Sequence, residues 1–131
     1  MLSEPLNEIK SFEDLECWKH CKELRSFTKP IISKFPKEEK FRLYDQIIRA
    51  VRSTTNNIAE GYGRFHYQEN IQFCRVSRGS LFELIDHFII AEEENYISNE
   101  TLLEIKLKIN RCLAILNGYI NYLRKAKTVN N

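Results

Sequence analysis

The chain has 131 residues, of which 43% are hydrophobic and 29% are charged, and 20 Lys and Arg residues against 18 Asp and Glu residues leave a formal net charge of +2. This length suits one domain with a single core, and the composition is that of an ordinary globular protein. Four Gly and three Pro residues in the whole chain argue against a linker and against a turn-rich β fold.

Residues 1–10 are expected to form a flexible N-terminal arm. Acidic Glu4 and Glu8 and the lack of an apolar run argue against a signal peptide, and the sequence contains no run of about 18 apolar residues that could span a membrane. We therefore expect a cytoplasmic protein. The cysteines each fall on an apolar helical stripe and are expected to be buried free thiols: Cys17, Cys21, Cys74 and Cys112.

The first predicted helix starts at Ser11. Ser11 followed by Glu13 and Asp14 is typical of a capping box with acids near the helix N-terminus. Apolar and small residues then follow at spacings of three and four as far as residue 35. Pro30 predicts a kink or an early end near residues 28–29, and Pro36 ends the helix.

The second predicted helix runs from about Lys37 to Tyr62, with apolar residues at spacings of three and four and a second apolar stripe beside them. One partner helix cannot cover that much apolar surface, so this helix is expected to be central. It closes with residues 57–64, Asn-Ile-Ala-Glu-Gly-Tyr-Gly-Arg. There, Gly61 and Gly63 are expected to end the helix and make a tight reversal, with Arg64 at its tip.

The third predicted helix runs from about Tyr67 to Asn95, and the fourth begins at Ser98 or Asn99 and continues to Leu123. Residues 125–131 form a polar tail that is expected to be frayed. Four long helices with short connections pack antiparallel to their neighbours. The sequence therefore predicts an all-α, antiparallel up-down-up-down four-helix bundle over residues 11–124.

Helical bundles often hold metals, but no histidine has the Glu-x-x-His spacing of a di-iron site: Cys, Gly and Leu stand three residues before His20, His66 and His87. Cys17, His20 and Cys21 could share a zinc ion, although no second pair completes four ligands; alternatively, the thiols are core side chains and His20 faces water. The sequence also lacks a nucleophile elbow and a Gly-rich phosphate loop. We therefore expect no enzymatic activity, no cofactor and no metal.

Charge is segregated along the chain. Residues 49–78 contain five arginines and two acids, whereas residues 80–104 contain seven acids and no Lys or Arg. In an up-down bundle the turn after the second helix shares an end with the C-terminal cations Arg124, Lys125 and Lys127, so one end is expected to be basic and the other acidic. The candidate nucleic-acid-binding residues are Arg49, Arg52, Arg64, Arg75 and Arg78.

This charge pattern has two interpretations. In the functional one, arginine side chains bind phosphate oxygens, and Tyr62, Phe65 and Tyr67 near the turn stack on unpaired bases. In the alternative, the arginines belong to an ordinary solvated surface, partly offset by the acids at positions 13, 14 and 16, and each aromatic belongs to the core or to an interface.

Apolar surface is in excess on the second helix, and Ile90 and Leu103 are among the apolar residues that lie off the main stripes. Gly79 and Ser80 would let another backbone approach the third helix, either within the chain or between subunits. We therefore expect a closed homo-oligomer rather than a monomer.

Several motifs, taken in order, resemble those of one known family. They are Phe-Glu-Asp-Leu at 12–15 with Trp18, Arg-Ala-Val-Arg-Ser at 49–53, Asn-Ile-Ala-Glu-Gly-Tyr-Gly-Arg at 57–64, Phe73, and Arg-Gly-Ser-Leu at 78–81 with Glu83 and Leu84. They resemble the bacterial four-helix bundle proteins encoded by intervening sequences of large-subunit rRNA genes, over about residues 11–123. The matching family positions are Asn57, Glu60, Gly61, Arg64, Gly79, Ser80 and Glu83.

The resemblance implies a homopentameric bundle with no known enzymatic activity and an expected association with nucleic acid. A related bundle is the accessory protein of the reverse transcriptase of diversity-generating retroelements, so that role is implied as well. Three hypotheses stay open. The first is a non-catalytic oligomer that binds RNA, or DNA, through its basic end. The second is a protein-interaction scaffold, such as an accessory subunit to a reverse transcriptase, and the third is a metal-dependent or thiol enzyme that uses Cys17, His20 and Cys21.

Overall fold

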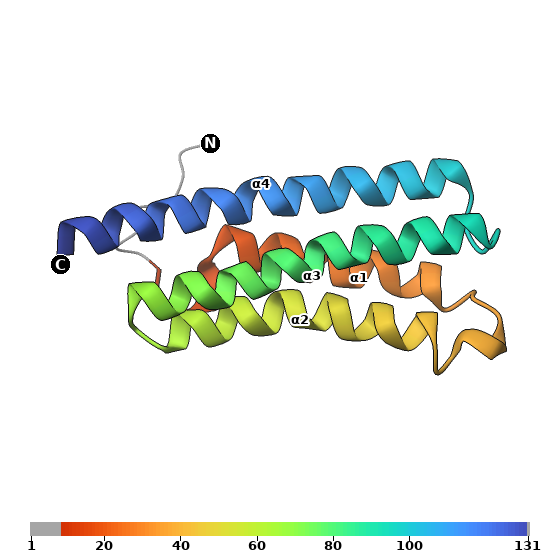
Figure 1. Ribbon diagram of the computed structural model, residues 1–131, viewed down its shortest axis with the longest axis horizontal. Coiled ribbons are helices and arrows are strands. Elements are labelled where there is room, and N and C mark those ends of the chain that lie inside the picture. Colours follow the sequence, from red (N-terminus) through yellow and green to blue (C-terminus); the bar gives the residue numbers. More distant parts are fainter. Residues whose placement is uncertain (1–8, 131) are drawn as a thin grey trace.

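The structure is a computed structural model in which residues 9–130 are described, so residues 1–8 of the expected N-terminal arm and Asn131 lie outside the described residues. Its helices are α1 (Glu16–Ile32), α2 (Leu43–Gly63), α3 (Tyr67–Glu93) and α4 (Asn99–Asn130), with short 3-10 turns at η2 (Phe12–Asp14) and η3 (Lys37–Glu39). Figure 1 shows the four helices side by side along one long axis. Residues 9–130 contain no strand, which confirms the all-α bundle.

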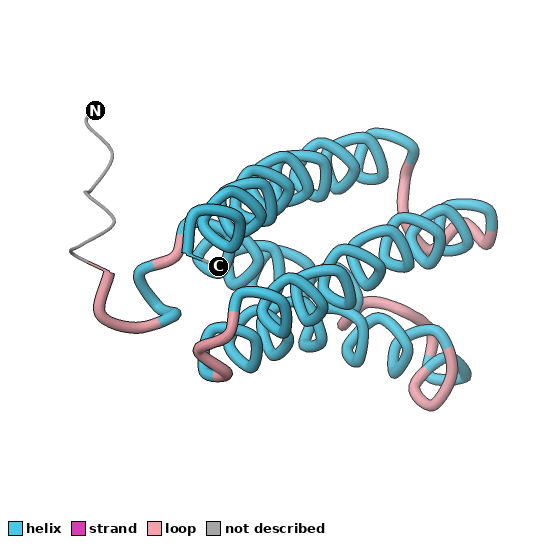
Figure 2. The backbone as a smooth tube through the Cα atoms, turned by 60° about the vertical axis from the view of Figure 1, so that its left-hand side comes forward, coloured by secondary structure: helices cyan, strands magenta, loops and turns pink. Residues whose placement is uncertain are grey.

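The helices form a ring of neighbours. α2 and α4 each pack against both α1 and α3, whereas α1 and α3 lie across the bundle from one another, as do α2 and α4. Short connections make successive helices antiparallel (Figure 2). The α2–α3 turn and the C-terminal end of α4 therefore lie at the same end of the bundle, near the start of α1 (Figure 1).

Helix α1 begins later than the sequence pattern predicts. Ser11 Oγ accepts a hydrogen bond from the Glu13 amide at 3.1 Å, and the Asp14 carboxylate accepts from the amides of Lys10 and Ser11 at 2.9 and 3.2 Å, which completes the expected capping box. These backbone donors lower the pKa of Asp14 because they stabilise its ionised form. The box caps the turn η2, and α1 starts only after Leu15.

Helix α1 also continues past Pro30 to Ile32, so the expected early end near residues 28–29 does not occur. Pro30 is exposed, and its missing N–H removes one hydrogen bond of the helix. The last turn is held because Thr28 and Ile32 are buried on either side of the proline, and because the Ser33 hydroxyl donates to the Pro30 carbonyl at 2.8 Å.

Helix α2 begins at Leu43 rather than Lys37, because the intervening residues form η3 and a turn. The Glu39 carboxylate organises this connection by accepting from the Tyr96 hydroxyl at 2.7 Å and from the Leu43 amide at 3.3 Å. The Tyr96 bond lowers the pKa of Glu39 and raises the pKa of Tyr96 to about 12, since it favours the ionised acid and the protonated phenol. The α1–α2 connection is thereby tied to the α3–α4 turn.

The reversal between α2 and α3 is not made by the glycines. Gly61 and Gly63 both lie inside α2, and neither has a positive φ. The left-handed residue is Phe65, with a φ of 61°. Gly61 instead permits close packing on α3, because a Cβ at this position would lie 2.7 Å from Asn70 Oδ1 and 3.0 Å from Phe73 Cβ.

The core contains apolar side chains from all four helices, the largest of which include Leu24, Ile47, Leu81, Phe88, Ile105 and Leu116. The four cysteines are buried free thiols, as expected. Burial raises the pKa of Cys74 to about 12 and also raises that of Cys17, because a thiolate is poorly solvated there. Residues 9–130 include no helix long and apolar enough to cross a membrane.

Helix α4 continues to Asn130, so residues 125–130, expected to be a frayed polar tail, are its last turns. The C-terminal end of α4 extends beyond the start of α3 at this end of the bundle (Figure 1). Because the helix does not end at residue 124, Arg124 and Lys127 lie on regular helical turns next to α3.

The two ends of the bundle do not divide into one basic and one acidic end. The α1–α2 connection lies at the same end as the acidic α3–α4 turn (Figure 1). It brings exposed cations to that end: Lys34, Lys37, Lys40 and Arg42. The end that holds the α3–α4 turn was expected to be acidic and is instead mixed in charge. The expectation from the sequence did not count the cations of the α1–α2 connection.

Candidate nucleic-acid interface

The five predicted arginines do not form one cluster, and two of them are paired with acids. Arg49 Nε lies 3.0 Å from Asp45 Oδ2. Arg64 Nε lies 3.0 Å from Glu60 Oε2, and its Nη1 lies 3.6 Å from Glu69 Oε2. These exposed ion pairs offset the charge of both arginines, which weakens their attraction for a phosphate group.

The other three arginines have no ion-pair partner among residues 9–130. Arg52 is exposed on α2. Arg75 and Arg78 lie one turn apart on α3, and Arg78 Nη1 donates to Asn117 Oδ1 of α4 at 2.9 Å. Because α2 and α4 lie across the bundle from one another, the structure separates Arg52 from the two arginines of α3 that approach α4.

Arg75 lines a groove of about 260 Å³ between α3 and the last turns of α4, which we call the basic groove. Its lining residues are Gln68, Ile71, Arg75, Arg124, Lys127 and Thr128. Lys127 Nζ donates to Gln68 Oε1, and Arg124 Nη1 donates to Asn121 Oδ1 at 3.4 Å. These partners are neutral amides, and among residues 9–130 no carboxylate lines the groove, so the described residues do not compensate the charge of its three cations.

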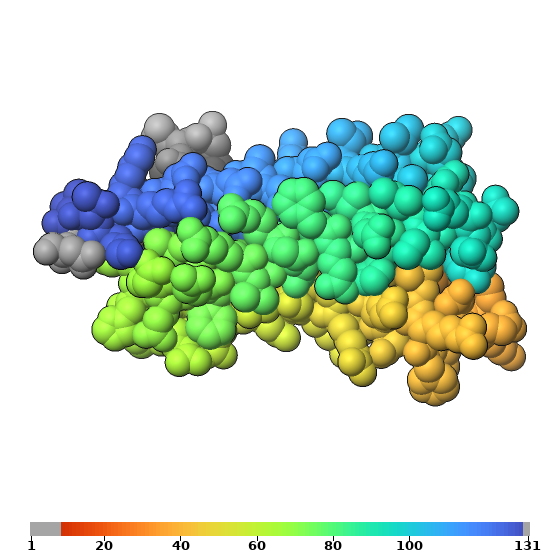
Figure 3. Space-filling model, in the orientation of Figure 1, coloured from red at the N-terminus to blue at the C-terminus, as the bar shows by residue number. Residues whose placement is uncertain are grey.

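The sequence placed Arg124 and Lys127 at the end of the bundle that holds the α2–α3 turn, but did not indicate that they belong to the candidate site. The last turns of α4 lie against the first turns of α3 on the face seen in Figure 3, and this packing brings both cations next to Arg75. The spacing of polar residues after residue 123 could have indicated a longer helix, but not which residues of α3 it would meet.

A second hollow, of about 320 Å³, lies at the same end of the bundle, and we call it the aromatic pocket. Its rings are Tyr62, Phe65, His66, Tyr67, Tyr119 and Tyr122. The Tyr119 and Tyr122 rings stack with centroids 6.3 Å apart, and Asn70 Nδ2 donates to the Tyr119 hydroxyl at 3.0 Å. Burial raises the pKa of Tyr119, so its phenol stays protonated and can donate in turn.

The structure brings together the three aromatics singled out in the sequence, Tyr62, Phe65 and Tyr67, and adds two tyrosines that sequence reasoning missed. Tyr119 lies on the apolar stripe of α4 and was therefore counted only as a core residue. Tyr122 lies one turn further along the same helix. Only the packing of α4 on α3 shows that both rings face this pocket.

The hypothetical zinc ligands do not converge. Cys17 and Cys21 are buried, while His20 Nδ1 lies 2.9 Å from the Glu16 carbonyl oxygen. In the described part of the chain, no group of three or more His, Cys, Asp and Glu side chains is placed to hold a metal ion. The raised pKa of the Cys17 thiol also disfavours the thiolate that metals bind.

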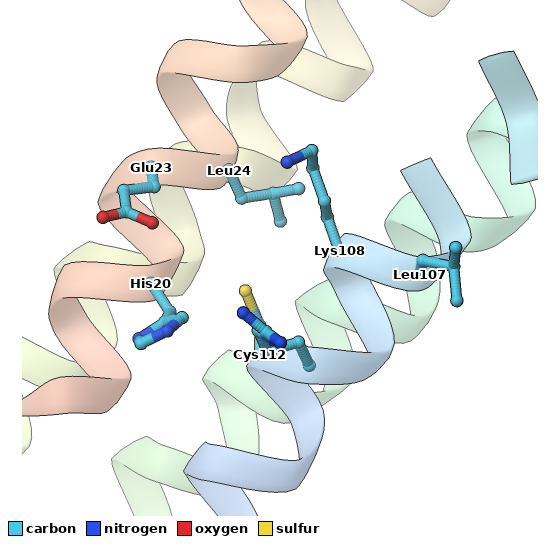
Figure 4. A pocket seen from close by; sticks show the side chains of 7 residues that line it. His20, Glu23, Leu24, Leu107, Lys108 and Cys112 are labelled. Atoms are coloured by element: carbon cyan, nitrogen blue, oxygen red, sulfur yellow. The ribbon is translucent and has the colours of Figure 1, made fainter. Parts of the chain in front are cut away.

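His20 instead lines a hollow of about 380 Å³ between α1 and α4 (Figure 4). Cys112 of α4 is opposite to it, and Glu23 and Lys108 lie at the rim (Figure 4). The charged side chains around this hollow are of both signs, so it has no net preference for an anion comparable to that of the basic groove.

Three of the seven family-motif positions, Asn57, Gly61 and Ser80, lie along the seam between α2 and α3. Ser80 Oγ lies 2.8 Å from Ser53 Oγ, and Asn57 Nδ2 donates to the carbonyl and hydroxyl oxygens of Ser53 at 2.8 and 2.9 Å. Gly61 lets the two backbones approach, while Gly79 is exposed and a Cβ there would meet nothing within 4 Å. Gly61 and Ser80 therefore help to pack α2 on α3.

Three further motif positions form ion pairs: Glu60, Arg64 and Glu83. Glu60 pairs with Arg64, and Glu83 Oε2 lies 2.8 Å from His87 Nε2 on the next turn of α3. His87 is buried, and its Nδ1 has no hydrogen-bond partner among the described residues. Each of these pairs joins residues four apart along the chain, the first at the end of α2 and the second within α3, and neither contributes to an exposed basic surface.

Most of the chain matches one known protein family. The sequence profile of the 23S rRNA-intervening sequence protein family matches residues 13–118. No curated protein matches the chain. The matched range includes all of α1, α2 and α3 and ends before Arg124 and Lys127 of the basic groove.

Proposed function

The chain belongs to the 23S rRNA-intervening sequence protein family, and from its surface we propose that it is a non-catalytic oligomer that binds RNA through the basic groove. One observation carries the proposal. Arg75 of α3 and Arg124 and Lys127 of α4 converge on a groove that no carboxylate of the described residues lines.

The chemistry of these three side chains suits a phosphate backbone. Guanidinium groups bind phosphate oxygens with two parallel hydrogen bonds, and the ammonium of Lys127 adds a point charge. Arg78 lies one turn further along α3, beside Asn117, and extends the same line of positive charge. A polyanion bound there releases counterions, so the affinity is expected to fall steeply as salt rises.

The test is a titration of a labelled structured RNA, followed by fluorescence anisotropy at two salt concentrations. The triple variant Arg75→Ala, Arg124→Ala, Lys127→Ala should bind more weakly. Its salt dependence should also be shallower, by about 0.7–0.9 in the slope of log K against log salt for each phosphate that the variant no longer neutralises.

A matched control removes the same charge from the other end of the bundle. Lys34, Lys37 and Lys40 are exposed around the α1–α2 connection. The variant with all three changed to Ala should keep the affinity and the salt slope of the parent protein. Equal losses in the two triple variants would mean that binding follows net charge and not the basic groove.

We also propose that the chain self-associates, and the assembly that the family resemblance implies is a homopentamer. Large apolar side chains are exposed on the outer surfaces of α3 and α4: Val76, Phe82, Leu103 and Leu107. A monomer would leave these side chains in water. Light scattering should give a mass several times the 15.6 kDa of one chain, and Leu107→Lys should lower it; a single-chain mass contradicts self-association.

A protein-interaction scaffold is the second candidate, and the same exposed apolar side chains favour it. In this case the surface of α3 and α4 binds a different protein, of which a reverse transcriptase is the example implied by the family resemblance. Capture of such a partner should survive nuclease treatment and moderate salt, because it depends on apolar contact. Loss of capture after nuclease treatment would favour the RNA-binding function instead.

A further inference from the structure

The aromatic pocket and the basic groove share α3 and α4, and the aromatic pocket is completed by Tyr62 of α2, by the α2–α3 turn and by residues that precede α1. Three pairs of consecutive residues divide between them: Tyr67–Gln68, Asn70–Ile71 and Leu123–Arg124. In each pair the first residue lines the aromatic pocket and the second lines the basic groove. The seam between α3 and α4 is thus a single wall with aromatic rings on one side and cations on the other.

The aromatic pocket has the properties of a site for a planar ring. Aromatic side chains form most of its wall, and polar groups at the edge, among them the Tyr119 hydroxyl and the His66 imidazole, can bond the edge of a heterocycle. Its volume of about 320 Å³ lies near the lower end of the range for small-molecule sites, about 300–1,000 Å³. It therefore suits one nucleobase and not a stack of bases.

Phe65 points to the same use of the aromatic pocket. Its φ of 61° is disfavoured for any residue with a Cβ, and 86% of its surface is exposed. A glycine would adopt this turn without strain, and a polar side chain would be better solvated. Phe65 therefore contributes little to stability in this position, whereas its ring is available for contact at the pocket, and strained residues tend to occur at binding sites.

We propose that the aromatic pocket receives one unpaired base of single-stranded RNA, whose neighbouring phosphates lie in the basic groove. The inference rests on the proposed function, because the basic groove supplies the phosphate contacts. A base within a duplex is paired and stacked and cannot enter the aromatic pocket, whereas an unpaired base can stack on its rings. The aromatic pocket thus makes the protein prefer single strands, which the basic groove alone does not.

The test compares a 3′-labelled single-stranded RNA with the same strand annealed to its complement, using the full chain and fluorescence anisotropy. The double variant Phe65→Gly, Tyr122→Ala removes two rings of the aromatic pocket. Both residues are exposed, by 86% and 40%, and glycine suits the φ at position 65, so the fold is retained. The affinity for the single strand should fall about tenfold or more, with the affinity for the duplex and the salt slope unchanged.

Phe41→Ala is the matched control, because Phe41 is 85% exposed and precedes α2 at the other end of the bundle. It should leave both affinities unchanged. Equal affinity of the parent protein for the two RNAs, or an unchanged single-strand affinity in the double variant, overturns the inference about the aromatic pocket while RNA binding by the basic groove stands. If the parent protein binds neither RNA at low salt, the proposed function itself fails.

Discussion

Gly61→Ala is a direct probe of how α2 packs on α3. In an isolated helix this change is stabilising by about 1 kcal/mol, because glycine loses more backbone entropy than alanine. In the folded protein, the new Cβ would lie 2.7 Å from Asn70 Oδ1, 3.0 Å from Phe73 Cβ and 3.1 Å from the Asn70 carbonyl oxygen. The last two atoms cannot rotate away, so α2 and α3 must move apart.

The expected size of the effect follows from these contacts. Overpacking of a tight site costs about 1–3 kcal/mol. The Asn70 amide is held by two hydrogen bonds, from Nδ2 to the Tyr119 hydroxyl at 3.0 Å and from the Cys74 thiol to Oδ1 at 3.5 Å, and displacing it costs about 1 kcal/mol more. After the gain in helix propensity is subtracted, the free energy of unfolding should fall by about 1–3 kcal/mol.

Urea unfolding followed by far-ultraviolet circular dichroism measures this change, with Gly63→Ala as the matched control. Gly63 lies two residues further along α2, is exposed, and has open space where a Cβ would be. Its substitution should leave the free energy of unfolding unchanged or raise it by up to about 1 kcal/mol. If Gly61→Ala is as stable as Gly63→Ala, the close-packing argument is refuted.

Three further changes test other features of the structure. Phe65→Gly should raise the free energy of unfolding by about 1 kcal/mol, because it removes a left-handed residue with a Cβ; a lower urea midpoint contradicts this. Ser80→Ala should lower the free energy of unfolding by about 1 kcal/mol in the same assay, because the buried Ser80 hydroxyl forms a hydrogen bond with the Ser53 hydroxyl. An unchanged urea midpoint would show that this hydrogen bond adds nothing to stability. Folding lowers the pKa of Glu39, so the stabilisation by ionised Glu39 is present above its ordinary pKa of 4.5 and is lost as pH falls through the lowered pKa. Folding raises the pKa of Tyr96 from 10.0 to about 12, so the stabilisation by protonated Tyr96 is lost as pH rises through about 12. Tyr96→Phe should therefore flatten the pH dependence of the urea midpoint at both limits, and unchanged profiles would exclude the Tyr96–Glu39 bond as their source.

The comparison of Gly61 with Phe65 explains one failure of sequence reasoning. A glycine near the end of an apolar helical pattern is equally compatible with a helix stop and with a close helix contact, because both use the missing Cβ. The structure has Gly61 in the helix against Asn70, and the left-handed conformation falls on Phe65. Only the position of the facing helix distinguishes the two uses.

By itself, the sequence determined the class of fold, the four helices and most of the core, because apolar spacings of three and four act locally along the chain. It also singled out Arg75 and the aromatics around the α2–α3 turn. The pairs Arg49–Asp45 and Arg64–Glu60 have the four-residue spacing of ion pairs within one helix, so they too can be read from the sequence. The tertiary structure alone decided that Arg75 meets Arg124 and Lys127, and that Phe65 and Tyr67 meet Tyr119 and Tyr122. The physical reason is that the register of α4 on α3 depends on how side chains interlock between the two helices, and the spacing of residues within either helix does not contain that information.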